Sequence, residues 1–182
     1  INVKIFNNGH VQMTGLKDIN HVDKVVQLFI DEVYHMIPED TLVFDFPEKP
    51  EIVDTNIALI NSDFDIGCQI DREKLHREII GAGYYSSFAS DIYPGVNIKY
   101  YSNSLNSSPG ICNCETPCDG KGKGDTCKRI TIAAFKSGKI IITGGKSADN
   151  IVTAYNFIRS FISAHIDEIK TGVMIEDLPT SS

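Results

Sequence analysis

The chain has 182 residues, of which 42% are hydrophobic, and its formal net charge is −7 at pH 7. Non-specific affinity for nucleic acid depends on clustered Lys and Arg, so this acidic balance argues against that class of binder. The sequence has no apolar run long enough to cross a membrane and no signal peptide, which favours an intracellular protein in a reducing compartment. Because it opens at Ile1, without Met and already within a strand pattern, we expect part of a longer polypeptide.

Two stretches that lie 129 positions apart share one pattern of turn residues. Residues 6–17 read FNNGHVQMTGLK, and residues 135–146 read FKSGKIIITGGK. Each predicts a strand, a Gly turn, a second strand that ends in Thr-Gly, and then a Lys. Two copies at this long spacing indicate a duplicated domain rather than a solenoid.

In the first copy, strict alternation over residues 1–6 and 11–14 predicts two half-buried strands. In both copies an amphipathic helix follows the hairpin. Asp18 and Ser147 are the expected N-caps, and apolar residues recur at three- and four-residue steps after each of them. We expect each copy to bury one hairpin face under its helix and to leave the other face free. We also expect the two hairpins to belong to one continuous antiparallel sheet.

Between the copies, residues 38–52 form a predicted acidic, Pro-containing linker, and residues 53–170 form the second repeat. This repeat has a strand over 57–67 with Ile60, Phe64 and Ile66 on one side, and a strand over 96–101 before its hairpin. The short helix between these strands is capped by Asp71, ends at the Gly81-Ala82-Gly83 run, and has the expected apolar stripe Leu75, Ile79 and Ile80. Residues 1–37 carry only the last three elements of this unit and are expected to be the second half of a first repeat. Residues 171–182 are a predicted C-terminal tail.

Residues 102–128 are rich in Asn, Ser and Gly and fall where a turn between two strands is expected, so they are predicted to be an insertion. They contain Cys112, Cys114, Cys118 and Cys127. A segment with so few large apolar residues cannot fold around a core of its own, so something must order it. Four thiolates suit a tetrahedral structural zinc, which we expect here. The spacing lacks two Cys-x2-Cys pairs, so disulfides or free thiols stay open as alternatives, and Cys68 is expected in the core.

The sequence offers no catalytic motif. Gly144-Gly145-Lys146-Ser147 has the ending of a phosphate-binding loop, but that loop needs a Gly five positions before its last Gly, and Ile140 stands there. The five His have no metal-ligand spacing, and neither a Gly-x-Ser-x-Gly motif nor a constellation of carboxylates is present. We therefore predict neither an enzyme nor a small-molecule substrate.

Several local strings resemble the TATA-box-binding protein family. Ile66-Gly67-Cys68-Gln69-Ile70-Asp71 is similar to that family's Leu-Gly-Cys-Lys-Leu-Asp, and Ile92-Tyr93-Pro94-Gly95-Val96 is similar to its Leu-Phe-Pro-Gly-Leu. The stretch from Phe135 to Lys139, followed by Thr143-Gly144, is close to its Phe-x-Ser-Gly-Lys and Thr-Gly-Ala-Lys. A Cys-rich insertion between these strands also resembles the TATA-box-binding-protein-like proteins of large DNA viruses.

The resemblance implies an α+β fold, a curved antiparallel sheet or saddle with helices on its convex face. The unit is duplicated about a pseudo-twofold axis, and the first repeat is incomplete here. It further implies a transcription initiation factor that binds and bends double-stranded A·T-rich promoter DNA through the minor groove. Other transcription initiation proteins or viral proteins would be its partners. For a viral protein the expected place is the viral factory in the host cytoplasm or the virion, and otherwise the nucleus.

The resemblance also assigns roles to individual residues on the concave face. Phe6, Phe135 and Tyr93 match positions that wedge between base steps, and Lys99 matches an Arg that contacts phosphate. The remaining matches are contacts to the floor of the groove: Gln12, Thr14, Asn61, Ile141 and Thr143. An ungapped match puts Leu59 at the family's central groove-reading Asn and turns Asn61, Asp63 and Asp65 to the concave side. A match with three extra residues puts Asn56 there instead.

The sequence also allows a second function. Two carboxylates turned toward phosphate-rich DNA would repel it, and the whole chain is acidic. The alternative is a saddle-shaped protein-interaction or virion structural module that has lost DNA binding.

Overall fold

The computed structural model describes residues 1–37, 50–102, 109–115, 118–123 and 126–171. The chain divides into two compact units, Ile1–Asn56 and Ile57–Ser182. The predicted linker over 38–52 lies outside the described residues except for 50–52. The predicted tail does so except for Thr171, and the Cys-rich insertion is described in part.

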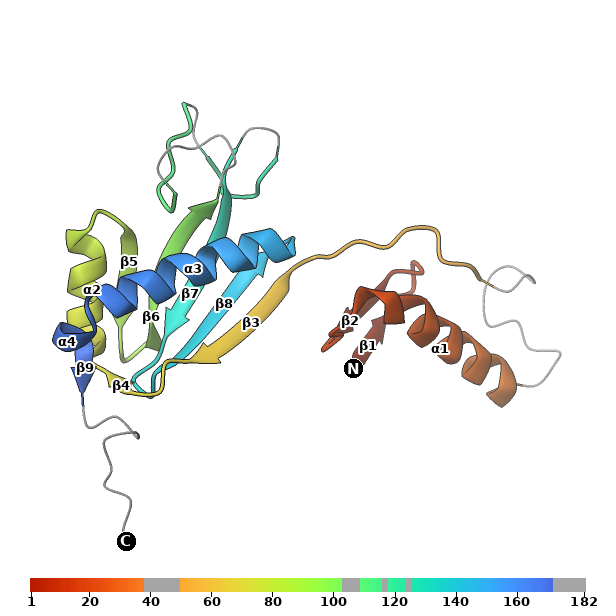
Figure 1. The fold of residues 1–182 in the computed structure, drawn as a ribbon. Helices are drawn as coiled ribbons and strands as arrows, with labels where there is room; N and C mark the ends of the chain where they lie inside the picture. The colour runs from red at the N-terminus through yellow and green to blue at the C-terminus, as the bar shows by residue number, and fades with distance from the viewer. Residues whose placement is uncertain (38–49, 103–108, 116–117, 124–125, 172–182) are drawn as a thin grey trace, which may run out of the picture. The chain divides into compact units, whose positions relative to one another are not determined.

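The first unit is a hairpin followed by a helix (Figure 1). Asp18 caps the short 3₁₀ turn that precedes the helix, because its side chain accepts a hydrogen bond from the Asn20 backbone N–H. Its elements are β1 (Asn2–Ile5), β2 (Val11–Thr14), η1 (Ile19–His21) and α1 (Val22–Met36).

The second unit is an antiparallel sheet with helices on one face (Figure 1). Its strands are β3 (Ile60–Asp65), β4 (Gln69–Ile70), β5 (Tyr85–Ala89), β6 (Tyr93–Ser102), β7 (Lys128–Ala134), β8 (Lys139–Gly145) and β9 (Lys170–Thr171). Its helices are α2 (Arg72–Gly81), α3 (Ala148–Ala164) and α4 (Ile166–Ile169). Five strands pair in the order β3-β8-β7-β6-β5, and β4 pairs with β9. This is the expected α+β class.

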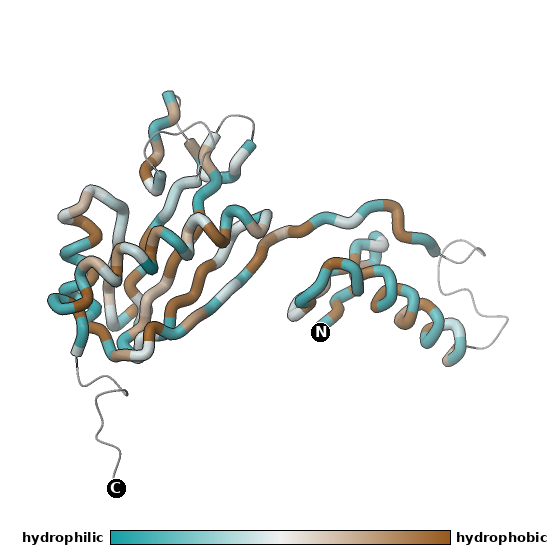
Figure 2. Tube along the Cα trace, viewed as in Figure 1, coloured by the Kyte–Doolittle hydropathy of each residue, from teal (hydrophilic) through white to brown (hydrophobic). Residues whose placement is uncertain are grey.

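The core lies between this five-stranded sheet and the helices. Ile98, Ile132 and Ile142 point from three neighbouring strands to the same face, where Leu75 of α2 and Ile158 of α3 are also fully buried. Figure 2 shows the hydrophobic segments along the strands that α3 crosses. Each such side chain contributes about 1.5–3 kcal/mol on burial, so this face holds the unit together.

The capping predictions for the second unit are confirmed. Asp71 accepts hydrogen bonds from the backbone N–H groups of the first turn of α2, and Ser147 accepts one from Asn150 N–H at the start of α3. Gly83 follows α2 with a φ of +84°, a conformation that favours Gly. The predicted stripe of α2 is wrong at Ile80, which is 49% exposed because the helix turns that position away from the sheet.

The two hairpins have the same register. Asn2 pairs with Thr14 and Lys4 with Gln12 in the first, and the positions 129 residues later, Thr131 with Thr143 and Ala133 with Ile141, pair in the second. The turns agree as well, since Gly9 N–H donates to Phe6 O over 3.0 Å and Gly138 N–H donates to Phe135 O over 2.9 Å. The two copies of the internal repeat therefore share the same strand pairing and the same turn hydrogen bond.

The two hairpins belong to different units, and one continuous sheet through both of them stays a prediction. β1 and β2 form a two-stranded sheet of their own, whereas β7 and β8 are flanked by β6 and β3. The burial differs accordingly. In the first unit Val3, Val11 and Met13 are only half-buried, and Ile5 is 44% exposed. Within the described residues, the first hairpin lacks the neighbouring strands that would complete its apolar face.

Two strand predictions also need correction. The first strand of the second repeat begins at Ile60 rather than at residue 57. A strand that the sequence did not predict, β5, pairs with β6 at the edge of the sheet. Its centre is Ser86-Ser87, and Ser86 is buried with its hydroxyl 2.8 Å from His76 Nδ1. Two serines in the middle of a short segment hide the alternation that marks a strand.

Candidate nucleic-acid interface and metal centre

The face of the five-stranded sheet opposite the helices, here called the open face, carries a continuous polar row. The strand registers place one residue from each of the five strands side by side, each directly opposite the next. From β3 to β5 the row is Asn61, Thr143, Thr131, Lys99 and Tyr85. Alternate residues of a strand point to opposite faces, and the neighbours of these residues point into the core. The row therefore runs across the whole width of the open face.

Two side-chain hydrogen bonds connect neighbouring members of this row. Thr143 Oγ1 donates to Asn61 Oδ1, which joins β8 to the edge strand β3. Lys99 Nζ donates to Thr131 Oγ1 over 2.9 Å, which joins β6 to β7. Burial, and then the positive charge of Arg129, lower the pKa of Lys99 below its ordinary value. Lys99 thus lies within the row, against the sheet.

The two carboxylates that would repel DNA both have structural partners. Asp63 forms an ion pair with Lys139 across the strand pair, with 3.0 Å between Oδ2 and Nζ. Asp65 accepts a hydrogen bond from Gly67 N–H over 2.8 Å and so shapes the turn after β3. One of the two negative charges is therefore balanced locally, and the second helps to hold a turn.

Two aromatic rings lie at one end of the open face. The centroids of Tyr93 and Phe135 are 5.9 Å apart, and the ring planes are tilted by 59°. Gly95 makes room for this pair, because a Cβ there would lie 2.8 Å from Tyr93 Cε1 and 3.2 Å from Phe135 Cε1. Arg72 of α2 donates to Pro94 O and so fixes the backbone between Tyr93 and Gly95. Tyr93 is 38% exposed, so the pair is accessible from solvent.

The site residues expected in the first unit lie on its hairpin. Gln12 and Thr14 are exposed on β2, and Phe6 is 45% exposed at the turn, with its ring 5.7 Å from that of His10. Five of the site residues expected in the second unit lie on strands of the five-stranded sheet: Asn61, Tyr93, Lys99, Ile141 and Thr143. The sixth, Phe135, lies on the turn that follows β7. The roles of all these residues stay predictions.

Three residues that shape this face were missed in the sequence. Thr131 completes the polar row, Lys139 pairs with Asp63, and Arg72 holds the backbone beside Tyr93. Thr131 carried a signal, since it is equivalent to Asn2 in the repeat and alternates with buried isoleucines. The other two depend on pairings between segments far apart in the chain.

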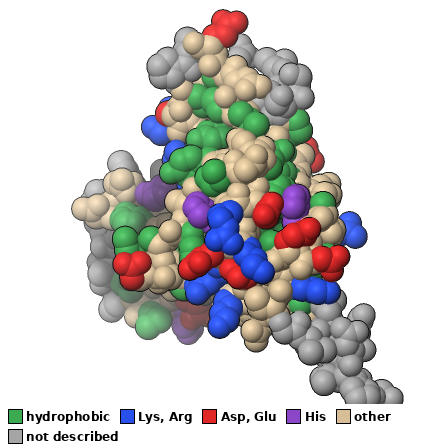
Figure 3. Space-filling view, turned by 90° about the vertical axis from the view of Figure 1, so that its left-hand side faces the viewer, with side chains coloured by type: hydrophobic (Ala, Val, Ile, Leu, Met, Phe, Trp, Pro, Cys, Tyr) green, Lys and Arg blue, Asp and Glu red, His purple; other side chains and the backbone are tan. Residues whose placement is uncertain are grey.

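Figure 3 shows the end of the second unit where α2 and α4 lie. Basic and acidic side chains are intermingled there, as the α2 sequence REKLHREIIG requires. Arg72 also lies over the Phe88 ring at 5.0 Å from its centroid. This end therefore has mixed charge.

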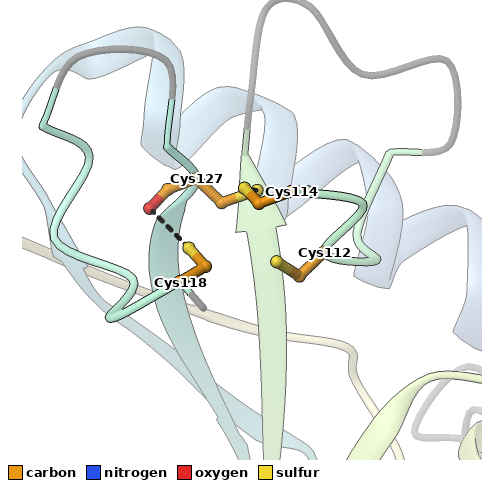
Figure 4. Close-up of side chains that lie close together, drawn as sticks. All are labelled: Cys112, Cys114, Cys118 and Cys127. Atoms are coloured by element: carbon orange, nitrogen blue, oxygen red, sulfur yellow. Dashed lines mark hydrogen bonds between the residues drawn. The ribbon is translucent and has the colours of Figure 1, made fainter. Parts of the chain in front are cut away.

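The four cysteines of the insertion converge on one point (Figure 4). The sulfur atoms of Cys112, Cys114, Cys118 and Cys127 all lie within 4.8 Å of one another. The Cys114 and Cys127 sulfurs are 3.4 Å apart, and none of the four cysteines forms a disulfide in the described residues. Tetrahedral zinc with Zn–S distances of about 2.3 Å requires sulfurs about 3.8 Å apart. The donor set and its spacing fit such an ion.

The polypeptide around the thiols is held by the ends of β6 and β7. Tyr101 and Gly110 exchange backbone hydrogen bonds of 3.1 Å, and Arg129 N–H donates to Gly120 O over 2.8 Å. Cys127 is fully buried, whereas the other three are half-buried. The cluster thus lies directly on the sheet end.

The thiols differ in acidity. Burial raises the pKa of the Cys127 thiol to about 12, and the neighbouring thiols of the cluster add to this rise. The backbone N–H of Cys114 lowers the pKa of the Cys112 thiol. Metal binding requires thiolates, so a metal that binds here must displace protons from the cluster.

Comparison with known proteins connects this geometry to a family. The sequence profile of the family described as "Transcription factor TFIID (or TATA-binding protein, TBP)" matches residues 54–165, which is more than half of the chain. The chain belongs to the TATA-binding protein family. Its fold is the TATA-binding-protein-like fold that the sequence resemblance implied, and the second unit contains nearly all of the match.

A relative from Acanthamoeba polyphaga mimivirus, named "TATA-box-binding protein-like", is 33% identical over 176 residues. The alignment covers 93% of this chain and 45% of the relative, so the chain spans about half the length of the viral protein. Among the described residues, the helices are too short or too polar to cross a membrane.

Proposed function

We propose that this TATA-binding-protein family member binds A·T-rich double-stranded DNA through the minor groove and bends it, as a transcription initiation factor. The observation that carries the proposal is the open face itself. It presents a polar row that crosses five strands and an accessible aromatic pair, Tyr93 and Phe135, at one end. Family membership and the name of the viral relative support the same role.

The chemistry of the face suits a minor groove. Threonine, asparagine and glutamine side chains can donate to the acceptors that A·T pairs present there, and apolar side chains such as Ile141 fill the space between them. An aromatic wedge unstacks a base step at a cost of a few kcal/mol and kinks the duplex. Tyr93 and Phe135 would supply this wedge in the second repeat, and Phe6 would supply it in the first.

The ion pair with Lys139 reduces the repulsion that Asp63 would exert on DNA at the open face. Lys99 is the cation nearest the centre of the row, and its hydrogen bond to Thr131 would have to yield for it to reach a phosphate. We therefore expect Lys99 to lie beside the backbone of the bound DNA.

We further propose that the cysteine cluster holds one structural zinc ion. The four sulfurs within 4.8 Å of one another support this. A bound ion would order an insertion that lacks an apolar core, and it would fix that insertion on the ends of β6 and β7.

A test of the DNA proposal compares two aromatic residues of similar exposure, Tyr93 at 38% and Tyr34 of α1 at 40%. Binding of the full-length protein to an A·T-rich duplex is measured by fluorescence anisotropy over a salt series. Tyr93→Ala should weaken binding, and Tyr34→Ala should leave it unchanged. Equal effects of both variants would refute the assignment of the open face.

The second candidate function is a protein-interaction or virion structural module, which the net charge of −7 favours. It predicts that the wild-type protein shows no salt-sensitive binding to any duplex. In that case the exposed aromatic residues would contact a protein partner instead.

A further inference from the structure

Two sulfur atoms of the cysteine cluster are in direct contact. Cys114 Sγ lies 3.4 Å from Cys127 Sγ, although 13 positions of sequence separate the two residues. The sulfurs of a disulfide bond are about 2.05 Å apart, so these two atoms need to approach by only about 1.4 Å. Figure 4 shows the two side chains meeting between the segment that follows β6 and the start of β7. The fold therefore brings together a pair of thiols that can be joined covalently.

The two thiols differ in their access to solvent. Cys127 is fully buried, whereas Cys114 is half-buried. A small oxidant in solution therefore reaches Cys114 first, and Cys127 lies in contact with it on the buried side. Redox-active cysteines often have this arrangement, in which an accessible thiol reacts with the oxidant and a neighbouring thiol resolves the product.

The fifth cysteine of the chain, Cys68, provides an internal comparison. It is buried, and its backbone oxygen lies beside Gly138, in the turn between β7 and β8. The cluster lies at the other end of β7, next to Lys128. A strand of seven residues spans about 20 Å, so Cys68 is too far from the cluster to pair with it.

We propose that Cys114 and Cys127 form an oxidation site, at which a peroxide converts the two thiols into a disulfide bond. The Cys114 sulfur attacks one oxygen of hydrogen peroxide, so that an S–O bond forms, the O–O bond breaks, and the other oxygen leaves as water. The Cys127 sulfur then attacks the Cys114 sulfur, so that the S–S bond forms, the S–O bond breaks, and the hydroxyl leaves as water. The two sulfurs lose two electrons and the peroxide gains them. The protons come from the thiols or, where thiolates bind zinc, from solvent.

The disulfide would replace the proposed zinc ion, and this step rests on the metal site proposed above. The bond uses two of the four sulfur ligands, and Cys112 and Cys118 alone cannot complete a tetrahedral sulfur site. The insertion would keep one cross-link to the sheet, because the new bond joins Cys114 to the residue that precedes β7. A metal would therefore hold the insertion under reducing conditions, and a covalent bond would hold it under oxidising conditions.

The test exposes the full-length protein, purified under reducing conditions and then freed of reductant, to hydrogen peroxide. Zinc release is followed with a coloured chelator, and disulfides are mapped by mass spectrometry after digestion without reduction. Peroxide should release the bound zinc and yield one peptide pair, joined through Cys114 and Cys127. Dithiothreitol with added zinc should reverse both changes, and Cys68 should stay unmodified throughout.

Two matched variants each remove one thiol of the cluster. Cys112→Ser should still form the disulfide, whereas Cys114→Ser should lose it and leave Cys127 as a thiol that can be alkylated after unfolding. Equal yields of several pairings in the wild type, or thiols that survive excess peroxide, would overturn the oxidation site alone. A wild type that holds no zinc but forms the Cys114–Cys127 bond would refute the metal site and support the oxidation site.

Discussion

Gly95→Ala should separate the placement of the aromatic pair from the stability of the fold. The new Cβ would lie 2.8 Å from Tyr93 Cε1 and 3.2 Å from Phe135 Cε1. Carbon atoms in ordinary contact are about 3.5–4.0 Å apart, so the Tyr93 ring must retreat by about 0.7 Å or more. Tyr93 is partly exposed and can make this shift without opening the core.

The expected effects on stability and on binding therefore differ. The free energy of unfolding should change by no more than about 1–2 kcal/mol, since strain at the rings is offset by the lower entropy of the unfolded chain. Binding to A·T-rich duplex should weaken by about 1–2 kcal/mol, roughly five- to thirtyfold, because a displaced wedge compensates less of the unstacking cost. Thermal melts and anisotropy measure the two quantities on the same samples.

Gly81→Ala is the matched control, because nothing lies within 4 Å of a Cβ built at the end of α2. It makes the same chemical change away from the open face and should leave binding unchanged. If Gly95→Ala binds A·T-rich duplex as tightly as the wild type and bends it equally, the Tyr93–Phe135 pair is not the wedge.

Three further predictions concern the metal, the turn and the cation. Protein purified under reducing conditions should contain about one equivalent of zinc by elemental analysis. The variant Cys127→Ser should lose this zinc and become susceptible to proteolysis within the insertion. Less than half an equivalent of zinc in the wild type would contradict the site. Gly138→Ala should lower the melting temperature strongly, since φ is +92° and the Cβ would lie 2.1 Å from Cys68 O; a melting temperature equal to that of the wild type would refute the turn geometry. Lys99→Met should weaken binding to all duplexes and flatten the salt slope by about one unit, whereas a sequence-selective loss would show that Lys99 reads bases.

The repeat was predictable because its turns depend on local chemistry. Gly9 and Gly138 both adopt positive φ, and each follows a Phe whose carbonyl accepts the hydrogen bond of the turn. A positive φ favours glycine over other residues, so a glycine stands at the same place in both copies and can be recognised in the sequence. The register of each hairpin then follows from the alternation of apolar residues between fixed turns.

The polar row and the thiol cluster required the structure. Asn61 meets Thr143 only because β3 pairs with β8 across 82 positions of sequence, and local patterns do not specify such a pairing. The cysteines had the right number but not the usual spacing for zinc. Their convergence depends on the bridges that Gly110 and Gly120 make to the strand ends.

Bending of A·T-rich DNA by the full-length protein tests the proposed DNA-binding function most directly. A duplex labelled at both ends reports bending as increased energy transfer, measured at several salt concentrations. We expect salt-sensitive binding with a large rise in energy transfer, and Phe135→Ala should retain part of the binding but lose most of the bend. A wild-type protein that shows no salt-sensitive binding, or that binds without any change in transfer, would contradict it.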